Sequence, residues 1–441
     1  MVEMKKIMKR SLVTELEKNI GEKVLVKGFL HELREQSKVK FVLLRDVSGI
    51  VQCVFLPEHK ESFESISKVS KESVIEIRGV LKKEKQAPSG FEIQAEEFSV
   101  LSEADRNMPI QVAEKGKEEP ALPTRLDYRW IDLRKPKNTL IFKIWTTLEA
   151  AMREYWISHG FIQIHTPKFV AGATESGAEL FSLDYFGKKA SLAQSPQFYK
   201  QMAMCAGFEK VFEVGPVFRA NKSHTVRHDT EFTSIDVEIS YIESHEDVMK
   251  LEEEWIKYSL KKVKETYGEE IQKTFGVEVI VPKTPFPRIT MENALSLLKK
   301  EYSHMCVGDL DPEGEKLLCE HFKKKEGSEF VFVTDWSIEV RPFYHMRSLN
   351  NTTNSFDLLW KGMEITTGAQ REHRYEILKK QALEKKVPLE GIKEYLEFFK
   401  YGCPPHGGYG LSPSRVVMLL LGLKNVREAT FLPRDPERLR P

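Results

Sequence analysis

The chain has few cysteines, no long apolar run and almost no net charge. Its five cysteines are scattered over 441 residues without a Cys-x-x-Cys pair, which argues against a disulfide framework and a structural zinc motif. The longest apolar stretch, residues 416–421, has six residues, whereas a membrane-spanning helix needs about 20. The N-terminus lacks the apolar core of a secretory signal. We therefore expect a cytoplasmic protein with reduced thiols and no membrane segment.

The charge balance limits the kind of partner that the chain can bind. Lys and Arg number 67 against 66 Asp and Glu, which leaves a formal net charge of +1. This balance excludes a polycation, but nucleic-acid binding needs only a local basic face. Hydrophobic residues make up 41% and charged residues 30% of the chain, as in ordinary globular proteins of two or three domains at this length.

Residues 1–106 have the pattern of a small β-rich domain. Strands are predicted at 24–31, 41–45, 50–55, 73–81 and 91–101, and a helix is predicted within 59–70, after the third strand. Five strands with one helix in that place predict an OB-fold β-barrel, a common reader of oligonucleotides. This segment holds 19 basic and 18 acidic residues, so recognition there must depend on stacking and hydrogen bonds.

The rest of the chain divides into a hinge and a larger domain. Residues 107–136 are rich in proline and charge, which is typical of a hinge. Within 137–441, a helix at 138–159 ends at Gly160, and strands then alternate with helices to the C-terminus. The charged stretches at 246–267 and 376–386 are predicted to be solvated helices. The fold class expected for the whole chain is α+β.

Two segments suggest binding of a polyphosphate. In 218–232, two strands flank a polar loop, with Arg219 after the first strand and Arg227 near the second. Arginine binds phosphate through a bidentate fork, and two such residues can bracket a polyphosphate. In 405–415, a glycine-rich strand leads into a helix at Arg415, where an anion is favoured. A surface hairpin with salt bridges is the alternative for the first segment.

Two further segments complete the pattern. Residues 362–373 place Glu364, Thr367 and Arg371 on a predicted strand, and the oxygens suit Mg²⁺ shared with a nucleotide. A buried ion-pair network is the alternative reading of this segment. Residues 160–167 lead from a helix into a strand that ends at proline, which alone indicates only a connection. Together the four segments predict a magnesium-nucleotide site on a sheet, and no Walker A sequence is present.

At these residues the chain resembles the class II aminoacyl-tRNA synthetases, and it is most similar to their archaeal-type aspartyl subgroup. Residues 160–167, 218–232 and 408–415 match motifs 1, 2 and 3, while 174–181, 194–200 and 364–373 match segments of the aspartyl subgroup. The resemblance implies an antiparallel catalytic sheet flanked by helices, following the OB-fold barrel. It also implies a homodimer formed through motif 1.

The resemblance implies the reaction and its participants. Aspartate would be activated by ATP and Mg²⁺ as an aspartyl-adenylate and then transferred to tRNA-Asp. Arg219 and Arg415 would be the catalytic residues. The ATP-binding residues would be Arg219, Arg227, His228, Asp229, Phe232, Glu364, Ser412, Pro413, Ser414 and Arg415. The metal ligands would be Glu364 and Thr367.

The resemblance also implies specificity for aspartate. The residues around the amino acid would be Glu175, Gln197, Lys200, Arg219, Thr367 and Arg371. Lys200 and Arg371 would bind the β-carboxylate as two buried cations. The neutral amide of asparagine would leave both cations unpaired, which favours aspartate.

In the barrel, the resemblance assigns anticodon contacts to His31, Phe41, Gln52 and Gln86. His31 stands where tRNA-Asp-restricted relatives carry tryptophan and relaxed ones carry histidine. We therefore predict that tRNA-Asn is charged with aspartate as well, whereas Gln86 matches neither variety. The alternative is that His31 is a strand residue without influence on specificity.

Two motif positions depart from the family pattern. Asn221 replaces the glutamate of motif 2, and residues 410–415 lack a glycine and a glutamate of motif 3. These changes bear on ATP affinity more than on the reaction itself. Two other functions stay open. One is a synthetase-like paralogue that binds RNA or regulates without charging tRNA, and the other is an enzyme of another specificity that makes asparaginyl-tRNA or a small amide from an activated acid.

Overall fold

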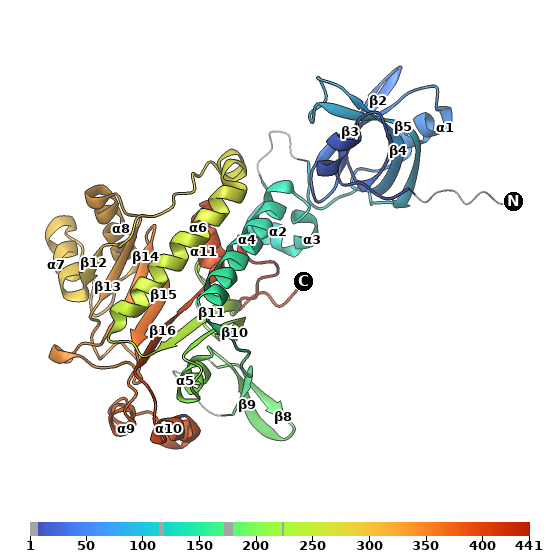
Figure 1. Ribbon diagram of the computed structural model, residues 1–441. Helices are drawn as coiled ribbons and strands as arrows, with labels where there is room; N and C mark the ends of the chain where they lie inside the picture. Colours follow the sequence, from blue (N-terminus) through green and yellow to red (C-terminus); the bar gives the residue numbers. More distant parts are fainter. Residues whose placement is uncertain (1–7, 114–118, 172–179, 223–224) are drawn as a thin grey trace. The chain divides into compact units, whose positions relative to one another are not determined.

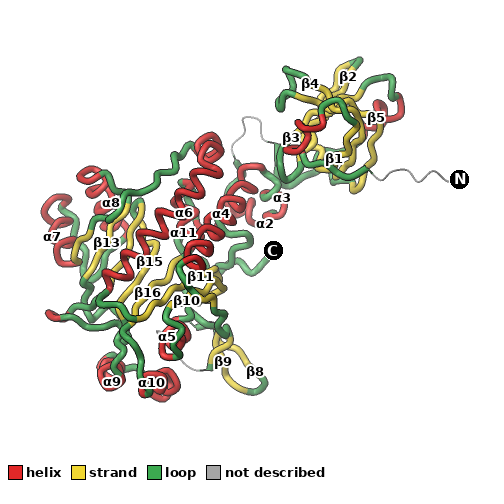
Figure 2. Tube along the Cα trace, in the orientation of Figure 1, coloured by secondary structure: helices red, strands yellow, loops and turns green. Residues whose placement is uncertain are grey.

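The structure is a computed structural model of the chain, and it describes residues 8–113, 119–171, 180–222 and 225–441 (Figures 1 and 2). The chain forms two compact units, Met1–Leu140 with Pro441, and Ile141–Arg440. Residues 107–136 fall within the first of these units, and their role as a separate hinge stays a prediction. None of the described helices combines the length and apolarity needed to cross a bilayer.

The first unit contains a closed five-stranded barrel with strand order β1-β2-β3-β5-β4. Its elements are η1 (Val13–Asn19), β1 (Lys23–Gln36), β2 (Val39–Arg45), β3 (Ile50–Phe55), α1 (Lys60–Ser65), η2 (Ile66–Lys68), β4 (Val74–Lys83) and β5 (Phe91–Ser102). The helix follows the third strand, so the predicted OB-fold is confirmed. After the barrel come the short helices α2 (Leu122–Asp127) and α3 (Arg129–Asp132).

The alternation of side chains along the strands determines which residues point into the barrel core and which point outward. On β2 and β3, Val42, Leu44, Val51 and Cys53 are fully buried in the barrel core. Phe41 pairs with Val54 and Leu43 pairs with Gln52. Because successive strand residues point to opposite faces, Phe41 and Gln52 both project from the outer face as diagonal neighbours.

The second unit is built on an eight-stranded sheet of order β12-β13-β14-β15-β16-β11-β10-β6. Its strands are β6 (Ile162–Gln163), β10 (Lys210–Phe218), β11 (Glu231–Ser240), β12 (Arg288–Thr290), β13 (Phe330–Thr334), β14 (Ser355–Trp360), β15 (Met363–Gln370) and β16 (His406–Leu411). The two edge strands pair in parallel and all inner pairs are antiparallel. The predicted antiparallel sheet is therefore confirmed for its centre.

Helices and a small sheet surround this central sheet. The helices are α4 (Pro136–Ser158), α5 (Gln197–Cys205), α6 (His245–Phe275), α7 (Met291–Tyr302), α8 (Pro312–Glu326), α9 (Tyr375–Glu384), α10 (Lys393–Lys400) and α11 (Pro413–Leu421), with η3 (Leu349–Asn351), η4 (Leu389–Ile392) and η5 (Val426–Glu428). The small sheet has the order β7-β9-β8, with β7 (Phe169–Val170), β8 (Ser182–Tyr185) and β9 (Lys188–Leu192).

One face of the central sheet is covered by α4 and α6, which run side by side in Figure 1. Trp156 of α4 packs 5.8 Å from Trp255 of α6 and 5.1 Å from Phe212 of β10, measured between ring centroids. Trp255 in turn stacks 6.2 Å from Tyr409 of β16. Aromatic burial of this kind is a large apolar contribution to folding, and it leaves the other face of the sheet for the site.

The register aligns polar side chains across the inner strands. Asp236 on β11 stands opposite Gly410 on β16, Gly410 stands opposite Thr367 on β15, and Thr367 stands opposite Asp357 on β14. Strand neighbours in one row share a face of the sheet. Segments far apart in the sequence therefore meet in a single row, with glycine in its middle.

Candidate active site

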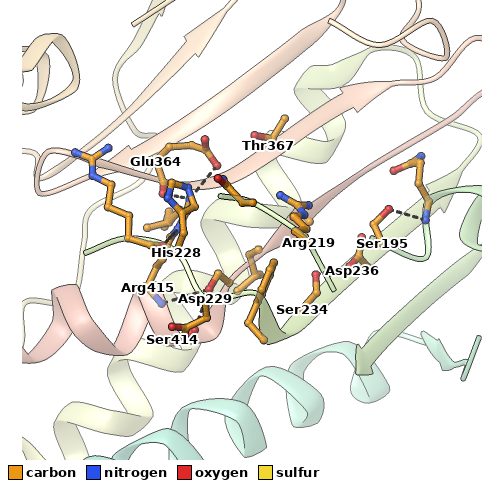
Figure 3. Close-up of a pocket in the computed structure, with 18 of the residues that line it drawn as sticks. Ser195, Arg219, His228, Asp229, Ser234, Asp236, Glu364, Thr367, Ser414 and Arg415 are labelled. Carbon is orange, nitrogen blue, oxygen red and sulfur yellow. Dashed lines mark hydrogen bonds and ion pairs between the residues drawn. The ribbon is translucent and has the colours of Figure 1, made fainter. Parts of the chain in front are cut away.

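A cavity of about 380 Å³ is lined by three residues of this row, Asp236, Gly410 and Thr367. Its lining from β11 includes Phe232, Ser234 and Asp236, which alternate with Ile235 and Val237 in the buried core. Figure 3 shows side chains from several segments converging on the cavity. The predicted site residues that line it are Gln197, Arg219, Arg227, His228, Asp229, Phe232, Glu364, Thr367, Arg371, Ser412, Ser414 and Arg415.

Of the predicted active-site residues that the structure describes, Lys200 and Pro413 do not line the cavity. Lys200 is only 2% exposed and contacts Asp236, which does line it. Pro413 is buried at the first position of α11. Glu175 lies outside the described residues, so its predicted contact with the substrate ammonium remains a prediction.

One end of the cavity carries a buried cluster of opposite charges. Arg371 donates from Nε to Glu238 Oε1 at 2.9 Å and from Nη2 to the carbonyl of Gly408 at 2.9 Å. Lys200 Nζ lies 3.1 Å from Asp236 Oδ1 and 3.3 Å from Glu238 Oε2. Burial alone would raise the pKa of Glu238, but Arg371 and Lys200 outweigh burial and lower it.

This cluster corrects the expectation of two unpaired cations. Lys200 and Arg371 are already compensated by Glu238, which is fully buried between them, and by Asp236. A buried charge without a partner costs several kcal/mol, and the carboxylates on β11 remove that cost before any ligand binds. Arg371 lines the cavity, whereas the ammonium of Lys200 contacts Asp236, Glu238 and the carbonyl of Tyr409. The cluster therefore presents compensated charge to a ligand.

Glycine is required beside the cluster. A Cβ at Gly408 would lie 2.0 Å from the carbonyl oxygen of Val237 and 2.2 Å from Glu238 Oε2. No side chain fits at those distances. The glycine-rich strand β16 thus lets the buried carboxylate and Arg371 approach the backbone, as its composition suggested.

Uncharged side chains hold the charged cluster in place through hydrogen bonds. His345 is buried, and burial together with Arg371 holds its pKa well below the ordinary value. The neutral ring accepts from Arg371 Nη1 at Nε2, 3.1 Å away. Gln197 donates to Gln201 Oε1 at 2.9 Å, and Tyr395 donates to the same oxygen at 3.0 Å. These contacts fix the helix α5 that carries both Gln197 and Lys200.

The other end of the cavity is rich in arginine. Arg219, which directly follows β10, lies with its guanidinium 5.5 Å from the ring centroid of Phe232. Arg227 Nη1 lies 2.5 Å from Glu315 Oε2 on α8. Arg415 lies near the start of α11, donates from Nη1 to the carbonyl of Glu364 at 3.2 Å and lies 3.5 Å from its carboxylate. This end therefore suits a polyanion.

Two titratable groups at this end are shifted by their surroundings. Burial, followed by the charge of Arg415, lowers the pKa of His228 to about 4. Burial raises the pKa of Glu315 to about 7, against the opposing effect of Arg227. His228 is therefore neutral at pH 7. Burial is the first cause of its lowered pKa, and the positive potential of the arginines is the second.

An acidic pair adjoins the arginine-rich end. Asp357 and Glu364 both line a second cavity of about 130 Å³, and Thr367 stands beside Asp357 on the neighbouring strand. Burial raises the pKa of Asp357 to about 6, and the charge of Glu364 adds to this effect. Asp357 Oδ1 is buried without a hydrogen-bond partner, although Oδ2 lies 2.7 Å from Arg341. This donor set fits a hard divalent cation.

The departures from the family motifs also lie at the cavity. Asn221 is part of its lining. Ser412 is the N-cap of α11, and its Oγ lies 3.0 Å from Ser414 Oγ. Asp229 accepts from Thr430 at 2.9 Å, and burial raises its pKa to about 6.

The predicted anticodon residues occupy different settings in the barrel. Gln52 donates to Glu92 at 2.8 Å, Phe41 is half-buried beside it on the outer face, and Gln86 is exposed. The ring of His31 contacts Arg45, which pairs with Glu72 at 2.8 Å. Burial would raise the pKa of Glu72, but hydrogen bonds from His31 and Arg45 lower it to about 2.

Several residues of the site were missed by the sequence reasoning. They are Ser195, Asp236, Glu238, Glu315, Arg341, His345 and Asp357. Glu238 carries a signal in the sequence, because it stands between Val237 and Ile239 on a strand. The others become visible only when the register brings distant strands together.

Comparisons with known proteins agree with this architecture. A family model described as tRNA synthetases class II (D, K and N) matches residues 121–436, and one described as OB-fold nucleic acid binding domain matches 24–101. The Aspartate--tRNA(Asp/Asn) ligase of Methanopyrus kandleri is 46% identical over 425 residues, 96% of each chain. The Aspartate--tRNA(Asp) ligase of Pyrococcus furiosus is 43% identical over 427 residues, 96% of this chain and 97% of the relative.

A solved structure extends the likeness. The asparaginyl-tRNA synthetase of Pyrococcus horikoshii, complexed with asparaginyl-adenylate, superposes with a TM-score of 0.90 at 32% identity, over 99% of this chain and 100% of that one. The chain thus belongs to the class II tRNA synthetases and, within them, to the archaeal-type aspartyl-tRNA synthetases. Its activity is the ATP-dependent ligation of aspartate to tRNA.

Proposed function

We propose that the 380 Å³ cavity binds aspartate at the Lys200–Arg371 end and ATP at the arginine-rich end, and that the two react there to give aspartyl-adenylate. The observation that carries this proposal is the row Asp236–Gly410–Thr367–Asp357, because it places both ends on one rigid sheet. A fixed distance between two bound reactants lowers the entropic part of the barrier.

The amino-acid end favours aspartate over asparagine through donor geometry. Lysine and arginine have only donors, so they match a carboxylate, which only accepts. The amide nitrogen of asparagine would face those donors and leave hydrogen bonds unmade, a loss that can reach 10⁴-fold or so in specificity. Gln197 would orient the substrate. Glu175 remains the proposed partner of its ammonium group.

At the nucleotide end we assign roles by chemistry. Arg219 and Arg415 would neutralise phosphate charge, with Arg227 and neutral His228 beside them and Phe232 stacking on the base. Asp229 and the segment of Ser412, Pro413 and Ser414 would border the nucleotide. Arg219 and Thr367, which both line the cavity, would also contact the aspartate carboxylate that attacks the α-phosphorus.

Glu364, Thr367 and Asp357 would hold Mg²⁺ with the nucleotide. Bound there, the ion supplies charge neutralisation at the phosphates. The unpartnered Asp357 Oδ1 and the mutual repulsion of Asp357 and Glu364 support this placement. The side chains themselves position and neutralise, so the activation step needs no side-chain nucleophile. The terminal ribose hydroxyl of the tRNA would then attack the adenylate carbonyl.

Pyrophosphate exchange tests the activation step. We expect exchange with aspartate and almost none with asparagine, followed by charging of tRNA-Asp. Absence of exchange with aspartate would refute the assignment of the cavity. Exchange with asparagine at a comparable rate would refute only the roles of Lys200 and Arg371.

We further propose that tRNA-Asn is charged with aspartate. The chain is about equally identical to a relative named for tRNA-Asp and tRNA-Asn and to one named for tRNA-Asp alone, so overall identity does not decide between the two specificities. The single position that favours relaxed specificity is His31, which clusters with Arg45 and Glu72. Replacing His31 by Trp removes a ring nitrogen that contacts Arg45 and adds a bulky indole to the outer wall. We expect His31→Trp to lower charging of tRNA-Asn about tenfold relative to tRNA-Asp, measured with transcripts of both. An unchanged ratio would show that His31 has no influence.

A further inference from the structure

The connection between α7 and α8 brings together a histidine, a cysteine and an aspartate that take no part in the site described above. His304 Nε2 lies 2.8 Å from Asp311 Oδ1, and Cys306 Sγ lies 3.6 Å from the same oxygen. All three ligand atoms lie within 4.8 Å of one another. Over the described ranges of the chain, these three form the one such group of His, Cys, Asp or Glu residues.

The spacing of the three atoms fits a shared transition-metal ion. Zinc binds histidine nitrogen and carboxylate oxygen at about 2.0–2.2 Å and cysteine sulfur at about 2.3 Å. In a tetrahedron these bonds place neighbouring ligand atoms about 3.3–3.7 Å apart. Of the separations in the cluster, the one from Cys306 Sγ to Asp311 Oδ1 is 3.6 Å and falls within that range. The one from His304 Nε2 to Asp311 Oδ1 is 2.8 Å and is shorter, so small side-chain rotations would complete the geometry.

The backbone holds the three residues in place. Ser303 ends α7 with a φ of 53°, and the loop turns again at Gly308, where φ is 75°. The backbone N–H of Gly314 donates to Asp311 Oδ1 at 2.8 Å. A Cβ at Gly314 would lie 2.8 Å from Cys306 Sγ and 3.2 Å from Asp311 Oδ1. The cluster thus packs against a position where only glycine leaves room for it.

We propose that His304, Cys306 and Asp311 form a binding site for one divalent transition-metal ion of the zinc class. Mixed nitrogen, sulfur and oxygen ligands select such an ion over Mg²⁺, which prefers oxygen alone. Three protein ligands leave a fourth position for water. The site is chemically distinct from the all-oxygen set of Asp357, Glu364 and Thr367.

The site is connected to the nucleotide end through α8. Asp311 is the N-cap of this helix, and Glu315, one turn further, contacts Arg227 at 2.5 Å. An ion held at the cap would fix the first turn of α8 and hence the position of Glu315. This consequence rests on the proposed function, whereas metal binding itself does not.

Cobalt substitution tests the proposal on the full chain. After removal of metals with a chelator, Co²⁺ is titrated in the presence of saturating Mg²⁺, which occupies the hard oxygen sites. We expect one Co²⁺ per chain, with sulfur-to-cobalt charge-transfer absorption and tetrahedral ligand-field bands. Competition with Zn²⁺ is expected to displace the cobalt.

Matched variants assign the ligands. Cys306→Ser is expected to abolish the charge-transfer band, and His304→Ala to weaken Zn²⁺ binding at least about tenfold. Cys403→Ser, which removes a thiol elsewhere in the same unit, is expected to change neither. Absence of the band in the unmodified chain, or its persistence in Cys306→Ser, would overturn the proposal.

Discussion

At the scale of single residues, Glu238 explains how the chain can keep two cations at the proposed amino-acid end of the cavity. Its carboxylate is fully buried and contacts both Lys200 and Arg371. Because the pair is compensated internally, the pocket is formed before substrate arrives. Removal of either cation therefore affects folding as well as binding, whereas a residue that contacted only the substrate would affect binding alone.

Arg371→Met is expected to remove aspartate activation and also to lower the free energy of unfolding by about 3–5 kcal/mol, because it leaves the charge of Glu238 partly uncompensated. Adding Glu238→Gln to this variant removes the orphaned charge, so most of the stability is expected to return while pyrophosphate exchange stays absent. Denaturant unfolding and exchange assays measure the two effects. If the double variant regained exchange, Arg371 would not bind the substrate.

Asp357→Asn tests the acidic pair. The amide keeps the shape but loses the charge, so we expect the Mg²⁺ concentration for half-maximal pyrophosphate exchange to rise about tenfold or more. Asp309→Asn is the matched control, since Asp309 lines the same 130 Å³ cavity outside the sheet. An equal shift in both variants would indicate a general charge effect rather than a ligand at Asp357.

At the scale of elements, the sequence predicted what local patterns control. The five barrel strands, the polar loop between β10 and β11 and the glycine-rich β16 follow from alternation and turn residues. The partners of Lys200 and Arg371 did not follow, because Glu238 meets them only through pairing of β11 with β16. Asp357 was missed for the same reason, since its row with Thr367 depends on register.

Helix α6 shows a second limit of local patterns. Its charged sequence predicted a solvated helix, yet Glu252 and Glu253 are both buried. Glu253 Oε1 accepts from the backbone of Phe286 at 2.9 Å and lies 3.0 Å from Arg288. Both oxygens of Glu252 lack a hydrogen-bond partner. A helix wheel cannot distinguish these neighbours, because tertiary packing decides which acid gains a partner.

Burial raises the pKa of Glu252 to about 8 from its ordinary 4.5. The folded state then holds a proton that the unfolded state loses, so this group makes the protein less stable as the pH rises from about 4.5 to 8. Glu252→Gln is expected to flatten that part of the stability profile and to add at least about 1 kcal/mol at pH 8.5. Urea unfolding across this pH range measures the change.

Glu253→Gln is the control for this prediction and has the opposite expected sign. It weakens the contacts to Phe286 and Arg288, so we expect a loss of about 1–3 kcal/mol at neutral pH. A gain in stability in both variants would mean that the burial of acids on α6, rather than the missing partners of Glu252, controls the effect.

At the scale of the whole molecule, near-zero net charge coexists with binding of a polyanion. Arg219, Arg227 and Arg415 gather at one end of the cavity, while Arg371 at the other end is compensated by Glu238. Charged residues thus act through their positions and not through the net charge. Phe41 and Gln52, on the outer face of the barrel, are expected to contact single-stranded bases. Binding of tRNA is expected to depend on few ion pairs and to show a shallow salt dependence.

Assembly is the last property that follows at this scale. Strand β6 is the edge of the central sheet, and its Ile162 is 46% exposed. Ile157, near the end of the preceding helix α4, is 61% exposed. An apolar edge of this kind favours pairing with a second copy, in agreement with the dimer expected through motif 1.

Light scattering is expected to give twice the chain mass of 51.0 kDa for the unmodified protein, and the mass of a single chain for Ile162→Asp. Ile280→Asp, at an isoleucine of 49% exposure elsewhere, is expected to stay dimeric. A single-chain mass for the unmodified protein would refute the dimer, and dissociation by both variants would refute the placement of its interface at β6.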